Sequence, residues 1–137
     1  MDNLPPGFEP YREPSPFLER IGPLYQKNGD PGPIFGVPIL DHHCNRRGFA
    51  HGGLLMSLAD IALGKTGEWS QQPRMSLLTA SLTIEFLGAA RIGDWIEATC
   101  DFHQLGRQMA FANCYLTVGN RRIARASGVF RVGERVP

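Results

Sequence analysis

Apolar and polar residues alternate strictly between residues 77 and 87, where Thr79, Ser81, Thr83 and Glu85 separate the apolar positions. This period is typical of a strand with one buried face. Three further strands are predicted after it, at about 94–104, 108–118 and 121–132. The short breaks between them contain Gly106-Arg107 and Gly119-Asn120, which suit tight hairpins. The pattern therefore predicts long antiparallel strands in the carboxyl-terminal half.

Residues 51–66 instead carry apolar groups on every side of a helical wheel, which is typical of a buried helix. The expected helix start, His51-Gly52-Gly53, contains no Ser, Thr, Asp or Asn, so its first N–H groups lack an obvious side-chain cap. Long antiparallel strands after one buried helix indicate an α+β fold, in which a curved antiparallel sheet wraps around a central helix.

Five of the eleven prolines fall within residues 1–16. This arm is expected to run extended over the surface, outside any helix or sheet ladder. Ser15 can cap a short helix that begins at Pro16 and ends near Ile21. Two short strands, 24–27 and 34–40, are expected to flank a turn at 28–32. We therefore expect a Pro-rich arm, 1–16, followed by a single domain, 17–137.

Composition and charge narrow the class of protein. The chain has 137 residues, of which 42% are hydrophobic and 20% charged, as in an ordinary single globular domain. Fourteen basic residues are balanced by thirteen acidic ones, which argues against a nucleic-acid partner. No apolar run approaches the roughly 20 residues of a membrane span, and three widely spaced cysteines favour a reducing compartment. A cytoplasmic protein without a membrane partner is expected.

Asp60 is the candidate for chemistry, because it lies about two turns into the apolar helix. Burying a carboxylate is costly unless it is paired or functional. Alternatively, Asp60 lies at a position that solvent can reach. Gly52, eight residues earlier, places the N–H groups of the helix start on roughly the same side as Asp60. Such N–H groups favour negative charge, so an oxyanion is expected to form between the two.

Asn45, Gly48, His51-Gly52-Gly53 and Leu58-Ala59-Asp60 together resemble the signature of hotdog-fold acyl-CoA thioesterases of the PaaI and hydroxybenzoyl-CoA thioesterase type. The resemblance covers roughly residues 17–132. It implies the hotdog fold and the hydrolysis of an acyl-CoA thioester to free acid and coenzyme A. It makes Asp60 the nucleophile or general base and the Gly52 N–H the donor to the carbonyl oxygen.

The same resemblance implies that Asn45 orients the attacking water or the substrate. Thr79 matches a Ser or Thr that often reaches the active site of the neighbouring subunit. His51 is either a structural hydrogen-bonding group or a catalytic acid.

The phosphates of coenzyme A require cations, and Gly53 lies at the helix start where the substrate is expected. We expect two or three arginines on loops or element ends to contact the nucleotide. The candidates are Arg46, Arg47, Arg74, Arg91 and Arg107.

Coenzyme A is part of the substrate, so no separate cofactor is expected, and the histidines have no metal-ligand spacing. An uncovered helix start and strand edge predict a homodimer or homotetramer.

Three alternatives compete with this interpretation. A hotdog hydratase would carry His five residues after the Asp, where this chain has Lys65. A nucleophilic Cys44 has no family pattern behind it. A non-catalytic acyl-CoA-binding module stays the main alternative, and it differs from an enzyme in retaining the intact thioester.

Overall fold

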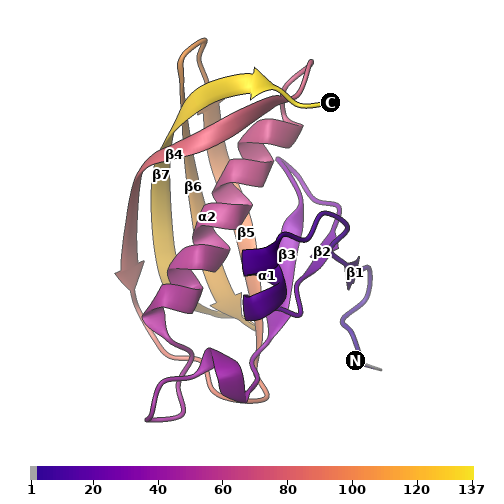
Figure 1. Ribbon diagram of the computed structural model, residues 1–137. Coiled ribbons are helices and arrows are strands. Elements are labelled where there is room, and N and C mark those ends of the chain that lie inside the picture. The colour runs from indigo at the N-terminus through magenta and orange to yellow at the C-terminus, as the bar shows by residue number, and fades with distance from the viewer. Residues whose placement is uncertain (1–2) are drawn as a thin grey trace.

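The computed structural model describes residues 3–137, apart from the side chain of Phe102, and shows one helix lying along the concave face of a curved sheet (Figure 1). The helix is α2 (Gly52–Trp69). The sheet is antiparallel throughout, with the order β1-β2-β3-β5-β6-β7-β4. Its strands are β1 (Glu9–Pro10), β2 (Tyr25–Lys27), β3 (Ile34–Pro38), β4 (Met75–Phe86), β5 (Trp95–Leu105), β6 (Met109–Val118) and β7 (Arg121–Arg135). The predicted α+β fold, a curved antiparallel sheet around a central helix, is confirmed.

The core lies between α2 and the inner face of the sheet. Leu58 and Leu63 of α2 and Phe130 of β7 are at most 2% exposed. Three of the four alternating buried positions of β6 are small, with Ala112 and Cys114 next to one another on that face. Small side chains let the helix approach the sheet closely, which explains how a helix that is apolar on most sides finds cover.

The amino-terminal arm is part of the sheet, so the expectation that it lies outside any ladder is wrong. Glu9 pairs with Gln26 of β2, and the Tyr11 N–H donates to the Leu24 carbonyl at 2.9 Å. Phe8 is buried against the ring of Trp95, with centroids 5.0 Å apart. Proline is tolerated in β1 because the outer side of an edge strand has no neighbouring strand to which a backbone N–H must donate. The division into arm and domain stays a prediction.

A short helix and a turn connect the arm to α2. Helix α1 (Pro16–Ile21) begins as predicted, with the Ser15 hydroxyl accepting the Leu18 N–H at 3.3 Å. The 3₁₀ turn η1 (Asp41–His43) was not predicted. Within it, His43 Nδ1 accepts the Leu40 N–H at 2.9 Å, and Nε2 donates to the Ile21 carbonyl at 2.6 Å. His43 therefore joins the end of α1 to the segment that leads into α2.

This double role of His43 predicts a pH dependence of stability. Burial lowers the pKa of His43 below its ordinary 6.5, and a protonated ring can no longer accept the Leu40 N–H. The unfolded chain therefore takes up the proton first. We expect the free energy of unfolding to be fully present above about pH 6.5 and to fall as the pH is lowered toward the folded-state pKa.

Urea unfolding of wild type and His43→Asn between pH 5 and pH 8 tests this. Asn can still accept one N–H but does not titrate, so the free energy of unfolding of the variant should depend less steeply on pH. The substitution should also lower that free energy by about 1–3 kcal/mol. An unchanged slope in the variant would show that His43 is not the group responsible.

Strand β4 is an open edge of the sheet. Among the described residues it pairs only with β7, over most of its twelve residues. The run from Leu78 to Ser81 is exposed on both strand faces, and the apolar Leu78 and Phe86 are 60% and 52% exposed. A long open edge that exposes large apolar side chains is typical of an interface. Within the described residues, no helix is long and apolar enough to cross a membrane.

Candidate active site

Asp60 and Thr79 meet where the middle of α2 faces the first half of β4. The Thr79 hydroxyl donates to Asp60 Oδ1 at 2.6 Å, and both belong to the same chain. This differs from the expectation that Thr79 reaches a neighbouring subunit. Asp60 is half-buried and Thr79 exposed, so the carboxylate lies on a partly wet seam. Thr79 fixes one carboxylate oxygen, and Oδ2 has no donor among the described residues.

A hollow of about 200 Å³ opens beside this carboxylate. Leu77 and Phe130 contribute apolar surface from the sheet, and Leu18 contributes apolar surface from α1. Lys65 and Glu68 lie one to two helical turns farther along α2. The candidate carboxylate therefore adjoins a small, mostly apolar space.

The start of α2 does have a side-chain cap, contrary to the sequence-based expectation. His51 Nδ1 accepts the Gly53 N–H at 2.8 Å. This contact supports the structural alternative for His51. It also occupies the N–H of Gly53, which is then not available to a substrate. Within residues 3–137 the N–H of Gly52 has no acceptor, which makes it the available donor at the helix start.

Glycine at position 52 leaves room for a neighbouring ring. A Cβ there would lie 3.3 Å from the ring of Phe86, the last residue of β4, which is a tight contact that the ring would have to relieve by a small shift. The alternation in β4 predicts only the strand face that Phe86 occupies, and not its contact with Gly52. The ring and the free N–H of Gly52 lie at the same end of α2.

Asn45 builds the loop before α2. Its Oδ1 accepts the N–H groups of Arg47 at 2.9 Å and Phe49 at 3.2 Å, an arrangement in which the side chain mimics a backbone turn. These two donors fix the orientation of the carboxamide, so its NH₂ group points away from them. Asn45 can therefore offer hydrogen-bond donors, but not its oxygen, to a substrate or water.

Gly52 and Asp60 of one chain are too far apart to act on one carbonyl. Eight residues of α-helix rise about 12 Å, and the N–H at the helix start points away from Asp60. A reacting carbonyl must lie about 3 Å from both the attacking group and the oxyanion donor. An oxyanion between the two groups of one helix stays a prediction, and the axial rise of the helix argues against it.

The five candidate arginines fall into two groups. Arg46 and Arg47 are exposed on the loop before α2. Phe49 belongs to that loop too, and the guanidinium of Arg91 lies 5.1 Å from the centroid of its ring. These three lie near the helix start. Arg74 and Arg107 lie at the other end.

Contacts near the end of α2 place this second group. Arg74 pairs with Glu68 at 2.6 Å and covers the ring of Trp69. Arg107 follows Leu105, which lies against Gly67 near the end of α2. Arg74 is therefore already committed to an ion pair, whereas the group at the helix start is open to a ligand.

Cys44 is not an activated nucleophile. Desolvation and the neighbouring Asp41 raise the pKa of its thiol, which disfavours the reactive thiolate at neutral pH. Cys100 and Cys114 are buried, as expected for small apolar residues. The described residues contain no cluster of three or more His, Cys, Asp or Glu that could hold a metal ion.

Comparison with known proteins agrees with this geometry. The family described as "Thioesterase superfamily" matches residues 47–124, more than half of the chain. A Pseudomonas aeruginosa relative named "Putative esterase PA0474" is 41% identical over 133 residues, which are 96% of this chain and 99% of that protein. The chain belongs to the thioesterase superfamily, a family of hydrolases.

Solved structures show the same fold. Zebrafish thioesterase superfamily member 2 is 26% identical, with a TM-score of 0.75 over 87% of this chain and 88% of that one. A Streptococcus mutans protein solved bound to acetyl-CoA has a TM-score of 0.66 at 23% identity, over 76% of this chain and 82% of that one. The predicted hotdog fold and family resemblance are thereby confirmed.

Proposed function

We propose that the protein hydrolyses acyl-CoA thioesters, with Asp60 as the catalytic carboxylate. The observation that carries the proposal is the Thr79–Asp60 hydrogen bond beside an apolar hollow, in a chain of the thioesterase superfamily. The acetyl-CoA bound by the Streptococcus mutans neighbour supports coenzyme A as the thiol part of the substrate. Asp60 Oδ2 is the oxygen left to react.

The reaction follows from these groups. Asp60 either removes a proton from water, which then attacks the acyl carbon, or attacks that carbon itself to form an anhydride that water hydrolyses. In both cases the carbonyl oxygen becomes negative, and the Gly52 N–H donates to it. The C–S bond then breaks, the sulfur leaves as thiolate and takes a proton, and the free acid remains.

The roughly 12 Å between Gly52 and Asp60 along one helix supports a site that two chains complete together. If a two-fold axis passes near Met56, halfway between them, Gly52 of one chain faces Asp60 of the partner subunit. The same axis crosses β4 between Thr79, which contacts Asp60, and Phe86, which contacts Gly52. This is the open edge described above, so pairing two copies there covers the edge and its exposed apolar side chains and assembles the site.

Asn45 then belongs with Gly52 in the half-site at the helix start. Its loop leads directly into α2, and its NH₂ group is available as a donor. In this arrangement Asp60 and Thr79 come from one chain, while Gly52 and Asn45 come from the other. Asn45 orients the substrate carbonyl or the attacking water.

Release of free thiol from a panel of acyl-CoAs tests the proposal. An enzyme releases coenzyme A in amounts that exceed the protein many times over. The alternative, a non-catalytic acyl-CoA-binding module, protects the thioester and shows saturable binding without thiol release. Binding without turnover across acetyl, aromatic, branched and medium-chain acyl groups would contradict the proposed activity.

The grouping of the arginines gives a prediction for the nucleotide. Replacing Arg46, Arg47 or Arg91 by Ala is expected to raise the KM for acyl-CoA, by about fivefold to a hundredfold for a lost charged hydrogen bond. The KM for the matching pantetheine thioester, which has no nucleotide, should change little. Arg107→Ala, at the far end of α2, is the matched control. Equal effects on both substrates would place the nucleotide elsewhere.

A further inference from the structure

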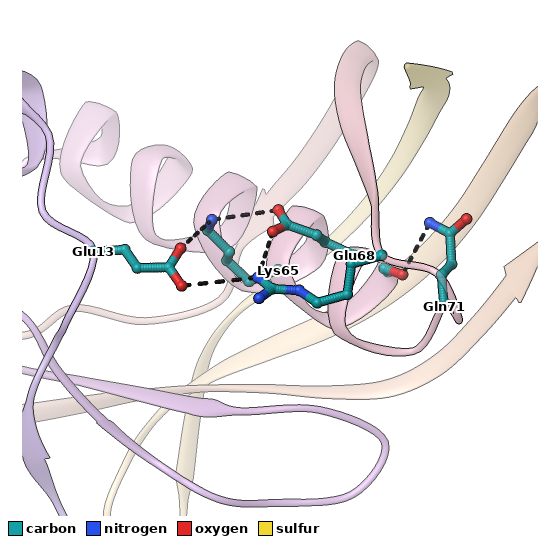
Figure 2. Close-up of polar contacts among 6 residues, drawn as sticks. Glu13, Lys65, Glu68 and Gln71 are labelled. Carbon is teal, nitrogen blue, oxygen red and sulfur yellow. Dashed lines mark hydrogen bonds and ion pairs between the residues drawn. The ribbon is translucent and has the colours of Figure 1, made fainter. Parts of the chain in front are cut away.

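An ion-pair cluster fastens the amino-terminal arm to α2 near the hollow. Glu13 lies 3.3 Å from Lys65 and 3.8 Å from Arg74, and Glu68 lies 3.3 Å and 2.6 Å from the same two cations. Figure 2 shows Lys65 between Glu13 and Glu68. Two positive and two negative groups balance, and Glu68 is only 8% exposed.

Lys65 is charged in this cluster. Desolvation alone would lower the pKa of Lys65, but attraction to Tyr11, Glu68 and Glu13 outweighs it and raises the pKa above the ordinary value. The ring of Tyr11 packs edge-on against Phe35, with centroids 5.4 Å apart. The arm is therefore held at Tyr11 by packing and at Glu13 by charge.

This fastening bears on the hollow beside Asp60 because both involve the same side chains. Lys65 and Glu68 line the hollow at the end away from Asp60. Leu18, five residues after Glu13, lines it from α1 and packs against the core. One segment of chain, Tyr11–Leu18, thus carries the clamp at Glu13 and, through Leu18, one wall of the hollow.

The dimensions of the hollow indicate what it can hold. Its volume of about 200 Å³ is below the roughly 300–1,000 Å³ of sites for drug-sized ligands, so it suits the acyl part of the substrate alone. Asp60 and Glu68 are about 12 Å apart along α2. An extended chain advances about 1.2 Å per bond, so about ten bonds span that length.

We propose that the segment Tyr11–Leu18, clamped by Glu13 onto Lys65 and Arg74, is the specificity-determining wall of the acyl pocket and limits the substrate to acyl groups of about ten carbons or fewer. A longer chain must separate Lys65 from Glu68 and leave partly buried charges unpaired against hydrocarbon, which is costly. The inference rests on the proposed function and adds the substrate class.

Two substitutions change the pocket in opposite directions, and hexanoyl-CoA and dodecanoyl-CoA are the probes. Gly64 lines the hollow between Asp60 and Glu68, and a Cβ there would meet Phe130 at 3.7 Å, an ordinary contact. Gly64→Ala is therefore expected to fold, with stability equal to or above wild type. Its methyl group narrows the pocket and should raise the KM for hexanoyl-CoA about tenfold, since one methylene is worth at least that in a fitted pocket.

Leu18→Ala removes part of the wall. It should raise the ratio of kcat/KM for dodecanoyl-CoA to that for hexanoyl-CoA about tenfold, and this change should appear in KM. Glu13→Gln, which removes the clamp, should raise the same ratio by a smaller factor. Glu9→Gln is its matched control, because Glu9 pairs with Arg12 at 3.0 Å on the exposed surface and takes no part in the ion pairs with Lys65 and Arg74. The control should leave the ratio at the wild-type value.

The outcomes separate this inference from the proposed function. Wild type that hydrolyses dodecanoyl-CoA as well as hexanoyl-CoA, or variants that change both substrates by one common factor, would overturn the acyl-pocket assignment while leaving the thioesterase intact. Wild type that releases no thiol from any acyl-CoA would overturn the proposed function and this inference with it. Should Leu18→Ala fail to fold, Glu13→Gln must still raise the ratio of kcat/KM for dodecanoyl-CoA to that for hexanoyl-CoA, and Gly64→Ala must still raise the KM for hexanoyl-CoA.

Discussion

Asp60→Asn is expected to lose a factor of about 10²–10⁴ in kcat for acyl-CoA hydrolysis, the usual contribution of a general base. Asn has the same shape, and its Oδ1 can still accept the Thr79 hydroxyl at the 2.6 Å position. It cannot remove a proton or form an anhydride at neutral pH. Thiol release under saturating acyl-CoA measures the loss, and thermal unfolding verifies that the variant is folded.

Asp101→Asn is the matched control. Asp101 is an exposed carboxylate on β5, outside the hollow and outside the contacts of Asp60, so the same change of charge should leave kcat near the wild-type value. A folded Asp60→Asn protein that keeps turnover within about tenfold of wild type would remove Asp60 from the catalytic role.

Sequence pattern predicted the elements well because each depends on local periodicity. Alternation placed the long strand at residues 77–87, where the structure has Met75–Phe86. The apolar helix was expected at 51–66 and extends to Trp69. Pro10 shows the limit of such rules, because its effect on a strand depends on whether the strand lies at an edge, and that is a property of the whole sheet.

The candidate site was only partly predictable. The motif residues Asp60 and Gly52 could be singled out from the sequence, but their separation of about 12 Å depends on the axial rise of the helix as well as on its face. Thr79 was singled out too, but its contact with Asp60 of the same chain depends on how β4 lies against α2. Spacing along the chain does not determine that packing.

The remaining contacts join residues that are distant in sequence or unusual for their role. Glu13 and Lys65 are separated by 52 positions, and no periodic pattern links them. His51 caps α2 through a ring nitrogen, although histidine is not among the preferred capping residues. Phe86 lies against Gly52 because of the curvature of β4, which the alternation does not report.

The central claim is that each active site takes Asp60 and Thr79 from one chain and Gly52 and Asn45 from its partner. Mixing Asp60→Asn chains with Asn45→Ala chains tests it directly. Each variant alone should be nearly inactive. After complete subunit exchange at equal amounts, half of the dimers are mixed, and one of the two sites in each mixed dimer has both residues intact.

We therefore predict that the mixture recovers about a quarter of wild-type thiol release, with native mass spectrometry verifying that mixed dimers have formed. Asp60→Asn mixed with a tagged copy of itself is the control and should recover nothing. No recovery in verified mixed dimers would show that both residues act from one chain, and a fully active monomer at assay concentration would contradict the shared site altogether.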